Sequence, residues 1–125
     1  MVGTTKSSLV ACVEDDEPVR DALRGLLRAS GIDVAAFSSA EDFLESEELQ
    51  KTACLVTDIQ LGGISGLDLL ERLSGSSLRI PTILITAHSD VAAGDRARNS
   101  GAISIFLKPV SPTALLRAIQ AALSS

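Results

Sequence analysis

An uncharged run that ends in a carboxylate is the feature that most constrains how this chain can fold. In residues 53–58, Ala-Cys-Leu-Val-Thr-Asp, five uncharged and mostly β-favouring residues lead directly into Asp58. Such a run is typical of a strand buried on both faces, as in a parallel sheet. The glycine-rich residues 60–66 mark the carboxyl end of this strand, where open α/β sheets place their chemistry. Asp58 is therefore either a reactive carboxylate or an aspartate that begins the turn by bonding its own backbone.

Apolar runs and amphipathic segments alternate along the rest of the chain. We predict strands over residues 9–13, 32–37, 53–58, 81–86 and 102–107. The first predicted helix begins at Pro18 and stops at Ser30 and Gly31, and the second begins within residues 38–42 and has Phe43, Leu44 and Leu49 on its inner face. Two more are predicted over residues 66–73 and over residues 91–99, the latter with Asp90 as its N-terminal cap. The last begins at Ser111 and Pro112. This alternation predicts an α/β fold with one doubly wound parallel sheet. We expect a single domain over residues 1–125, with its core between residues 9 and 123.

Charge and composition exclude several classes of protein. The chain is 46% hydrophobic, as in ordinary globular proteins, and its net charge of −5 disfavours direct binding to nucleic acid or to an anionic membrane. No apolar stretch reaches the length of a membrane span and the first residues are not those of a signal peptide, so we expect a cytoplasmic protein. Cys12 and Cys54 lie in apolar runs without metal-binding spacing, which predicts unreactive core thiols.

Polar residues stand at the ends of four predicted strands. Glu14 and Asp15 follow the first strand, Asp58 ends the third, Thr86 ends the fourth, and Lys108 follows the fifth. Because parallel strands end at one edge of a sheet, we expect these five side chains to share a crevice. Taken singly, each has an ordinary alternative role as a helix cap, a strand residue or a solvated charge. Their coincidence at the strand ends favours a functional site.

The chemistry of this set predicts phosphoryl transfer. Carboxylates placed together raise one another's pKa unless a cation joins them, and oxygen ligands of this kind suit Mg²⁺ or Mn²⁺. Thr86 and Lys108 would hold the other oxygens of a transferring phosphoryl group. Asp58 would be the nucleophile that forms an aspartyl phosphate.

From about Leu9 to Leu123, the chain resembles the receiver domain of bacterial two-component response regulators. The resemblance is carried by residues 13–20, by residues 56–58 with Ser65 and Gly66, by residues 85–87, and by Lys108 and Pro109. The pattern is most similar to receivers attached to LuxR-type DNA-binding domains. It implies a flavodoxin-like (βα)5 fold with strand order 2-1-3-4-5. It also implies a phosphoprotein of a phosphorelay that regulates transcription.

The resemblance assigns roles at the crevice. Asp58 accepts the phosphoryl group from a sensor histidine kinase. Glu14 and Asp15 hold Mg²⁺ together with the Asp58 carboxylate and the main-chain carbonyl of Gln60, whereas Asp16 is not a direct ligand.

The resemblance also implies roles for residues that contact the phosphoryl oxygens and for residues of the conformational switch. Lys108, preceding a cis peptide bond to Pro109, pairs with the phosphoryl oxygens, and Thr86 swings in to bond one of them. Gln60 and His88 flank the phosphoryl group and tune its hydrolysis, although His88 could equally be a plain loop histidine.

The chain departs from the family pattern at several positions. Gly62 replaces the usual proline, so we expect a more mobile loop after Asp58. Ile105 stands where a switching aromatic is usual, and Phe106 would point to the other face of its strand. Val110 replaces the common phenylalanine after Lys108 and Pro109. These departures put the aromatic part of the signalling relay in question, not phosphoryl acceptance.

We expect a signalling domain and not an enzyme, with at most weak self-phosphotransfer and autodephosphorylation. A degenerate receiver that only binds proteins is an alternative, which the intact five-residue set disfavours. A haloacid-dehalogenase type of enzyme is disfavoured because Gln60 stands where its second aspartate would lie, and no glycine-rich nucleotide motif follows the first strand.

The sequence does not indicate which effector domain or partner protein the receiver would control. The chain is either a stand-alone receiver or a part of a longer regulator. Any homodimer is expected to use the face formed by the fourth helix, fifth strand and fifth helix.

Overall fold

A five-stranded parallel sheet forms the centre of the computed structural model, which describes residues 8–87 and 91–124, with the backbone alone for 91 and 92. The strands are β1 (Leu9–Val13), β2 (Val34–Phe37), β3 (Thr52–Asp58), β4 (Thr82–Thr86) and β5 (Ala102–Leu107). They lie in the order β2-β1-β3-β4-β5, and every pair of neighbours is parallel. The predicted fold class and strand order are therefore confirmed.

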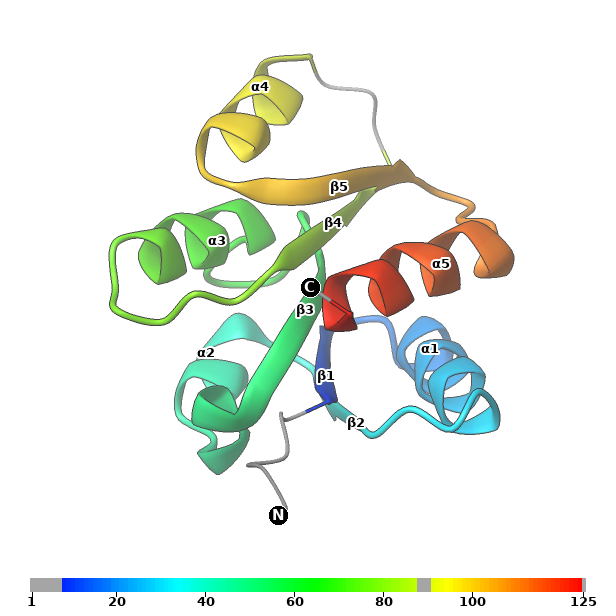
Figure 1. Ribbon diagram of the computed structural model, residues 1–125. Coiled ribbons are helices and arrows are strands. Elements are labelled where there is room, and N and C mark those ends of the chain that lie inside the picture. Colours follow the sequence, from blue (N-terminus) through cyan, green and yellow to red (C-terminus); the bar gives the residue numbers. More distant parts are fainter. Residues whose placement is uncertain (1–7, 88–90, 125) are drawn as a thin grey trace.

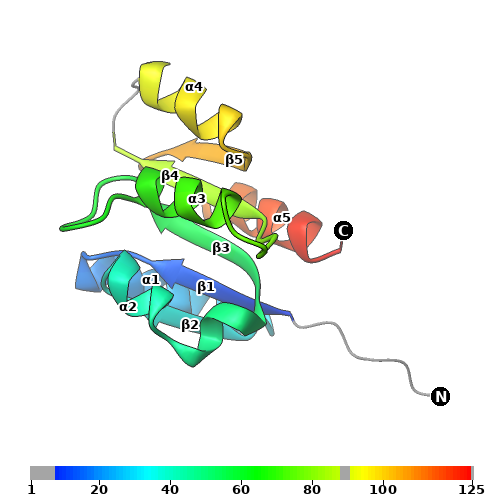
Figure 2. The same ribbon diagram turned by 90° about the vertical axis from the view of Figure 1, so that its left-hand side faces the viewer.

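Helices cover both faces of the sheet (Figures 1 and 2). They are α1 (Glu17–Ala29), α2 (Ala40–Leu44), α3 (Gly66–Ser74), α4 (Val91–Asn99) and α5 (Pro112–Leu123), with a 3-10 helix η1 at Glu47–Lys51. Helices α1 and α5 lie on one face, and α2, α3 and α4 lie on the other. Within the described residues, none of these helices has the length and apolar character needed to cross a membrane.

Helices α1, α2, α3 and α5 begin at or next to the predicted residues, whereas the Asp90 cap predicted for α4 lies outside the described residues. The Asp16, Ser39, Ser65 and Ser111 side chains each accept a hydrogen bond from a backbone N–H in the first turn of α1, α2, α3 and α5.

Strand β2 begins at Val34 and not at Ile32, because Ile32 closes the preceding helix. Gly31 has a φ of 75°, and the Ile32 N–H donates to the Leu27 carbonyl at 2.9 Å. A left-handed glycine followed by such a bond is a common way for a helix to end.

Leu49, which was predicted on the inner face of the second helix with Phe43 and Leu44, lies outside that helix. Helix α2 ends at Leu44, and Leu49 lies in η1. The Ser46 hydroxyl donates to the Phe43 carbonyl at 2.7 Å, which competes with the helical bonding pattern. Acidic residues also follow α2, where they oppose the negative end of a helix dipole. Leu49 nevertheless packs against the cluster that contains Phe43.

Strand β3 is buried on both faces, as its uncharged sequence predicts. Leu55 packs with Phe43 and the α3 leucines, whereas Val56 packs with Leu27 of α1 and Leu115 of α5. Aliphatic side chains dominate the fully buried residues, with Phe43 the one aromatic among those described. Cys12 and Cys54 are buried free thiols, and burial raises the pKa of each to about 12, as expected of unreactive core cysteines.

Two leucine truncations, one in the central strand β3 and one in the edge strand β5, test the assignment of Leu55 to the core. Leu55→Ala should lower the free energy of unfolding by ~2–5 kcal/mol, because it leaves a cavity in the packed centre. Leu107→Ala, the same change at a residue 53% exposed on the edge strand β5, should change it by about 0.5 kcal/mol or less. Urea unfolding followed by circular dichroism measures both values. Equal losses would contradict the assignment of Leu55 to the core.

Candidate functional site

Strand ends that are far apart in the sequence meet at one corner of the sheet. Lys108, directly after β5, places its Nζ 3.1 Å from Glu14 Oε1 and 2.5 Å from Asp58 Oδ2. Glu14 follows β1 and Asp58 ends β3, so three separate strands supply the cluster. The predicted convergence of these three residues is present in the structure.

Asp58 uses its two carboxylate oxygens differently. Oδ1 accepts a hydrogen bond from the Gln60 N–H at 2.9 Å, and Oδ2 accepts one from Lys108. The turn-forming aspartate and the site carboxylate, which were alternatives in the sequence, are thus one and the same residue. The residue is 6% exposed, at the rim of the sheet, so it is shielded from bulk water yet lies at the surface.

Glu14 is the more deeply buried acid of the pair, at 2% exposed. Its Oε2 accepts from the Asp16 N–H at 3.2 Å, and its main-chain carbonyl accepts from the Arg20 guanidinium at 2.9 Å. Burial raises the pKa of Glu14, and the bonds from Asp16 and Lys108 only partly offset that effect. Arg20 belongs to the first sequence motif, but its contact with the Glu14 carbonyl was not predicted.

Lys108 compensates the two buried acids. Burial lowers its pKa, but hydrogen bonds to Asp58 and Glu14 outweigh that effect and raise the pKa above its ordinary value. The ammonium therefore stays charged at neutral pH between two carboxylates. The peptide bond between Lys108 and Pro109 is cis, as the resemblance implies.

The remaining described residues that were predicted for the site are not part of the ion pair formed by Lys108, Glu14 and Asp58. Asp15 lies in the bend after Glu14 and is exposed to solvent. The Asp16 carboxylate accepts from the Val19 N–H at 3.2 Å and caps α1. Thr86 ends β4, where its carbonyl accepts from the Lys108 N–H at 2.8 Å. His88 lies outside the described residues.

Ile105 and Phe106 point to opposite faces of β5, as predicted. Ile105 packs with Leu84 and with Ala97 of α4, whereas Phe106 packs on the side of α5. The position expected to carry a switching aromatic therefore holds a half-buried aliphatic side chain beneath α4.

The donor set fits a hard divalent cation in its chemistry. Two buried carboxylates face one another across a single ammonium, and Mg²⁺ needs only one or two protein carboxylates beside its waters. Among the described residues, no three His, Cys, Asp or Glu side chains are grouped as a ready-made metal site. The reason is physical, since Asp15 points into solvent while Lys108 lies between the other two acids.

The loop of residues 59–65 joins Asp58 to α3 by a close backbone approach. The Gly66 N–H donates to the Ile59 carbonyl at 2.9 Å, and a Cβ at Gly66 would collide with the Asp58 carbonyl. Only glycine permits this approach. The loop is also contacted by Glu41 of α2, whose Oε2 accepts from the Ile64 N–H at 3.2 Å. No signal in the sequence indicated that Glu41 reaches across 23 residues to this loop.

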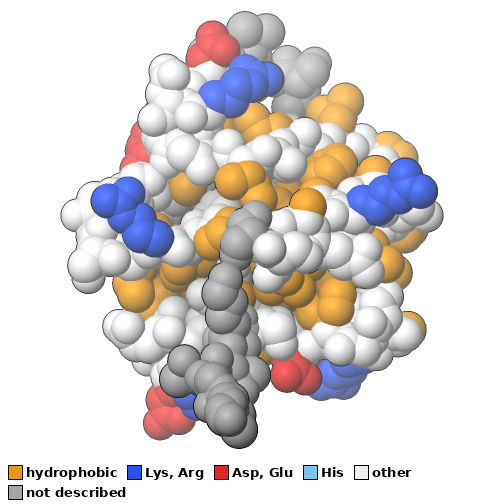
Figure 3. All heavy atoms as spheres, in the orientation of Figure 1, with side chains coloured by type: hydrophobic (Ala, Val, Ile, Leu, Met, Phe, Trp, Pro, Cys, Tyr) orange, Lys and Arg blue, Asp and Glu red, His pale blue; other side chains and the backbone are white. Residues whose placement is uncertain are grey.

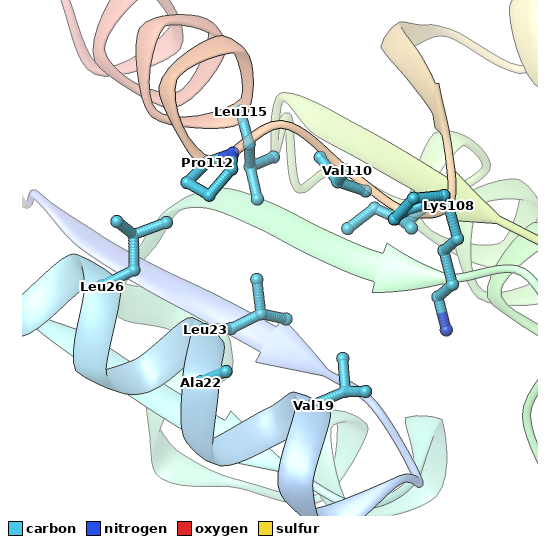
Figure 4. A pocket seen from close by; sticks show the side chains of 10 residues that line it. Val19, Ala22, Leu23, Leu26, Lys108, Val110, Pro112 and Leu115 are labelled. Atoms are coloured by element: carbon cyan, nitrogen blue, oxygen red, sulfur yellow. The ribbon is translucent and has the colours of Figure 1, made fainter.

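An apolar groove of about 530 Å³ lies beside the crevice (Figure 4). Val19, Leu23 and Leu26 of α1 line one side of it. Val110, Pro112 and Leu115 line the other, and Lys108 stands at its end. The groove thus offers an apolar surface next to the site.

The raised pKa of Glu14 predicts how stability depends on pH. A carboxyl whose pKa is higher in the folded than in the unfolded protein stabilises the fold most below its ordinary value of 4.5. That contribution is lost as the pH rises through the folded pKa. Urea unfolding in metal-free buffer should therefore show wild type losing stability relative to Glu14→Gln as the pH rises above 4.5. A constant difference between the two proteins would contradict the assignment, and Asp21→Asn, at an exposed site, serves as control.

Comparisons with known proteins agree with this geometry. The model of the family described as "Response regulator receiver domain" matches residues 10–120. Nodulation protein W of Bradyrhizobium diazoefficiens is 41% identical over 123 residues, covering 96% of this chain and 54% of that protein. Transcriptional regulatory protein FixJ of Rhizobium meliloti is 37% identical, covering 90% of this chain and 55% of that protein. The chain thus spans about half the length of the curated relatives it matches.

Solved structures give the same result. The crystal structure titled FixJ-N has a TM-score of 0.85 and 35% identity, and the match covers 96% of each chain. The response regulator StyR has a TM-score of 0.86 and 42% identity, and the match covers 93% of this chain and 59% of that one.

Proposed function

This chain belongs to the response regulator receiver family, and we propose that its Asp58 is the phosphoacceptor of a two-component signalling pathway. The observation that carries the proposal is the Lys108 ammonium shared between the Asp58 and Glu14 carboxylates at the carboxyl edge of the sheet. An ion pair of this kind prepares a nucleophile and a counter-charge for the incoming phosphoryl group in one place. We propose that residues 1–125 form a single receiver domain with its core between residues 9 and 123.

In the proposed reaction, an oxygen of Asp58 attacks the phosphorus of a phosphohistidine on a sensor histidine kinase. The new O–P bond forms as the P–N bond breaks, and the imidazole leaves with the electron pair of that bond. Lys108 turns its ammonium from the Asp58 carboxylate to an oxygen of the transferred group. Mg²⁺, held by Glu14, Asp15, Asp58 and the Gln60 carbonyl, would neutralise charge on the phosphoryl oxygens when bound.

The response to phosphorylation is proposed to pass through Thr86 and Ile105. Thr86 ends β4 beside the site and would hydrogen-bond a phosphoryl oxygen, moving the start of the β4–α4 connection. Ile105 packs beneath α4 and would follow that movement as an aliphatic contact. Gln60 and His88 are proposed to tune the attack of water on the aspartyl phosphate.

We propose a signalling protein and not an enzyme, in which self-phosphotransfer and autodephosphorylation are weak side activities. Its partner is a sensor histidine kinase, which we place over the apolar groove because that surface adjoins Lys108. A cytoplasmic location suits the two free buried thiols. Direct binding to nucleic acid is not expected, since the net charge is −5 and basic side chains lie well apart on the face shown in Figure 3.

Intact-mass spectrometry after incubation with acetyl phosphate tests the phosphoacceptor. Wild type should gain one phosphoryl group only when Mg²⁺ is present, and Asp58→Asn should gain none. Asp21→Asn, the same change at an exposed residue of α1, should behave as wild type. Lys108→Ala should reduce the rate severalfold or more, because a charged partner of the phosphoryl oxygens is lost. A folded wild type that gains no phosphoryl group would favour the protein-interaction alternative.

Any homodimer is proposed to form through α4, β5 and α5. On β5, Ile103 and Leu107 are large apolar side chains that are 49% and 53% exposed, beside the half-buried Ile105. Exposed aliphatic residues on an edge strand are suited to pairing with a second copy. We propose that phosphorylation of Asp58 switches either the protein contacts of a stand-alone receiver or the DNA-binding output of a longer regulator of the LuxR type.

Light scattering on the phosphorylated protein tests the dimer face. Ile103→Asp should shift the protein from dimer to monomer, because it buries a charge in the proposed interface. Ala29→Asp, at an exposed position of α1, should leave the dimer intact. Crosslinks confined to α1, or a loss of dimer with Ala29→Asp alone, would contradict the proposal.

A further inference from the structure

The loop after Asp58 has little intrinsic stiffness. Residues 59–65 contain Gly62 and Gly63, and Gly63 has a φ of 80°, which favours glycine. The sequence predicted a mobile loop because Gly62 stands where the family usually has proline. Both ends of the loop are nevertheless anchored, by the Gln60 N–H on Asp58 and by the Gly66 N–H on Ile59.

A carboxylate from a different part of the chain holds the middle of the loop. Glu41 lies in the first turn of α2, on the same face of the sheet as α3. Its Oε2 accepts from the Ile64 N–H at 3.2 Å, and a Cβ at residue 63 would collide with the same oxygen. A side chain at residue 63 would therefore require the Glu41 carboxylate to move from this position.

Apolar packing by the residues on either side of the two glycines supports the contact between Glu41 and the Ile64 N–H. Leu61 and Ile64 flank the two glycines and pack against the core cluster that includes Ala40 and Phe43 of α2. The second oxygen of Glu41, Oε1, is buried without a hydrogen-bond partner among the described residues. Burying a carboxylate oxygen without a hydrogen bond costs free energy, and such a group in a folded protein calls for an explanation.

We propose that Glu41 is a positioning residue for the phosphoacceptor site. It holds the backbone of residues 60–64 against α2, and this fixes the Gln60 peptide beside Asp58. The tether supplies the constraint that a proline would otherwise give to this loop. The inference rests on the proposed function for its consequence in phosphoryl transfer, but the tether itself does not depend on that function.

The tether predicts effects on the loop and on cation binding. Without the Glu41 carboxylate, the Ile64 amide loses its acceptor, and its hydrogen exchange should accelerate by about 10-fold or more. Since the Gln60 carbonyl is a proposed ligand of Mg²⁺, the dissociation constant for Mg²⁺ should rise by about 10-fold, as is usual when the residue that orients a ligand is removed.

Three variants separate the tether from general effects on α2. Glu41→Ala removes the acceptor, whereas Glu41→Gln keeps an oxygen at the same distance along the side chain and should restore most of the tether. Asp42→Ala removes a carboxylate from the same helical turn, one that accepts a hydrogen bond from the Ser38 hydroxyl and, among the described residues, none from the loop. The measurements on unphosphorylated protein are amide exchange and Mg²⁺ titration, both followed by nuclear magnetic resonance. The rate of phosphorylation by acetyl phosphate is then measured against Mg²⁺ concentration.

The expected result is fast exchange at Ile64 and weak Mg²⁺ binding in Glu41→Ala, with near wild-type values in Glu41→Gln and Asp42→Ala. The phosphorylation rate of Glu41→Ala should approach that of wild type at saturating Mg²⁺, since the nucleophile is untouched. Unchanged exchange and Mg²⁺ affinity in a folded Glu41→Ala would overturn the inference. So would equal defects in Glu41→Ala and Asp42→Ala. Failure of wild type to gain a phosphoryl group would instead count against the proposed function, while exchange and titration still decide the tether.

Discussion

The structure of the site depends on one ammonium group held between two buried carboxylates. Glu14 and Asp58 are both less than a tenth exposed, and ionised acids in such surroundings are costly unless a cation joins them. Lys108 provides that cation from the end of a third strand. Under the proposed function, this ammonium would turn to a phosphoryl oxygen, and a bound cation would take its place between the acids.

The sheet makes this interaction possible over long distances in sequence. Parallel pairing of β1 with β3 and of β3 with β4 brings the carboxyl ends of the strands to one edge, and β5 adds the lysine beside them. Leu55 and Val56 pack helices on both faces of β3, so Asp58 ends a rigid element. The loop after it is flexible by composition and relies on contacts with its neighbours. Rigid strands and contacts to the loop together place Asp58, the proposed phosphoacceptor.

Much of the fold and part of the site could be predicted from local patterns. The uncharged run before Asp58 predicted a buried strand, and the serines at residues 39 and 111 marked helix starts, because strand burial and capping are local effects. The sequence predicted the ends of helices and strands less well where local hydrogen bonds compete with those of the helix or the sheet. The Ser46 hydroxyl divides the second helix, and the Ile32 amide closes α1 instead of extending β2.

The sequence by itself determined which residue types end each strand, and hence that acids, a hydroxyl and a lysine share one edge of a parallel sheet. Only the tertiary structure decided which of them touch. It paired Lys108 with Glu14 and Asp58, left Asp15 in solvent, and used Asp16 as a helix cap. It also brought Glu41 to the Ile64 amide. Strand ends follow from local chemistry, whereas contacts between side chains depend on how separate elements pack, which no local pattern encodes.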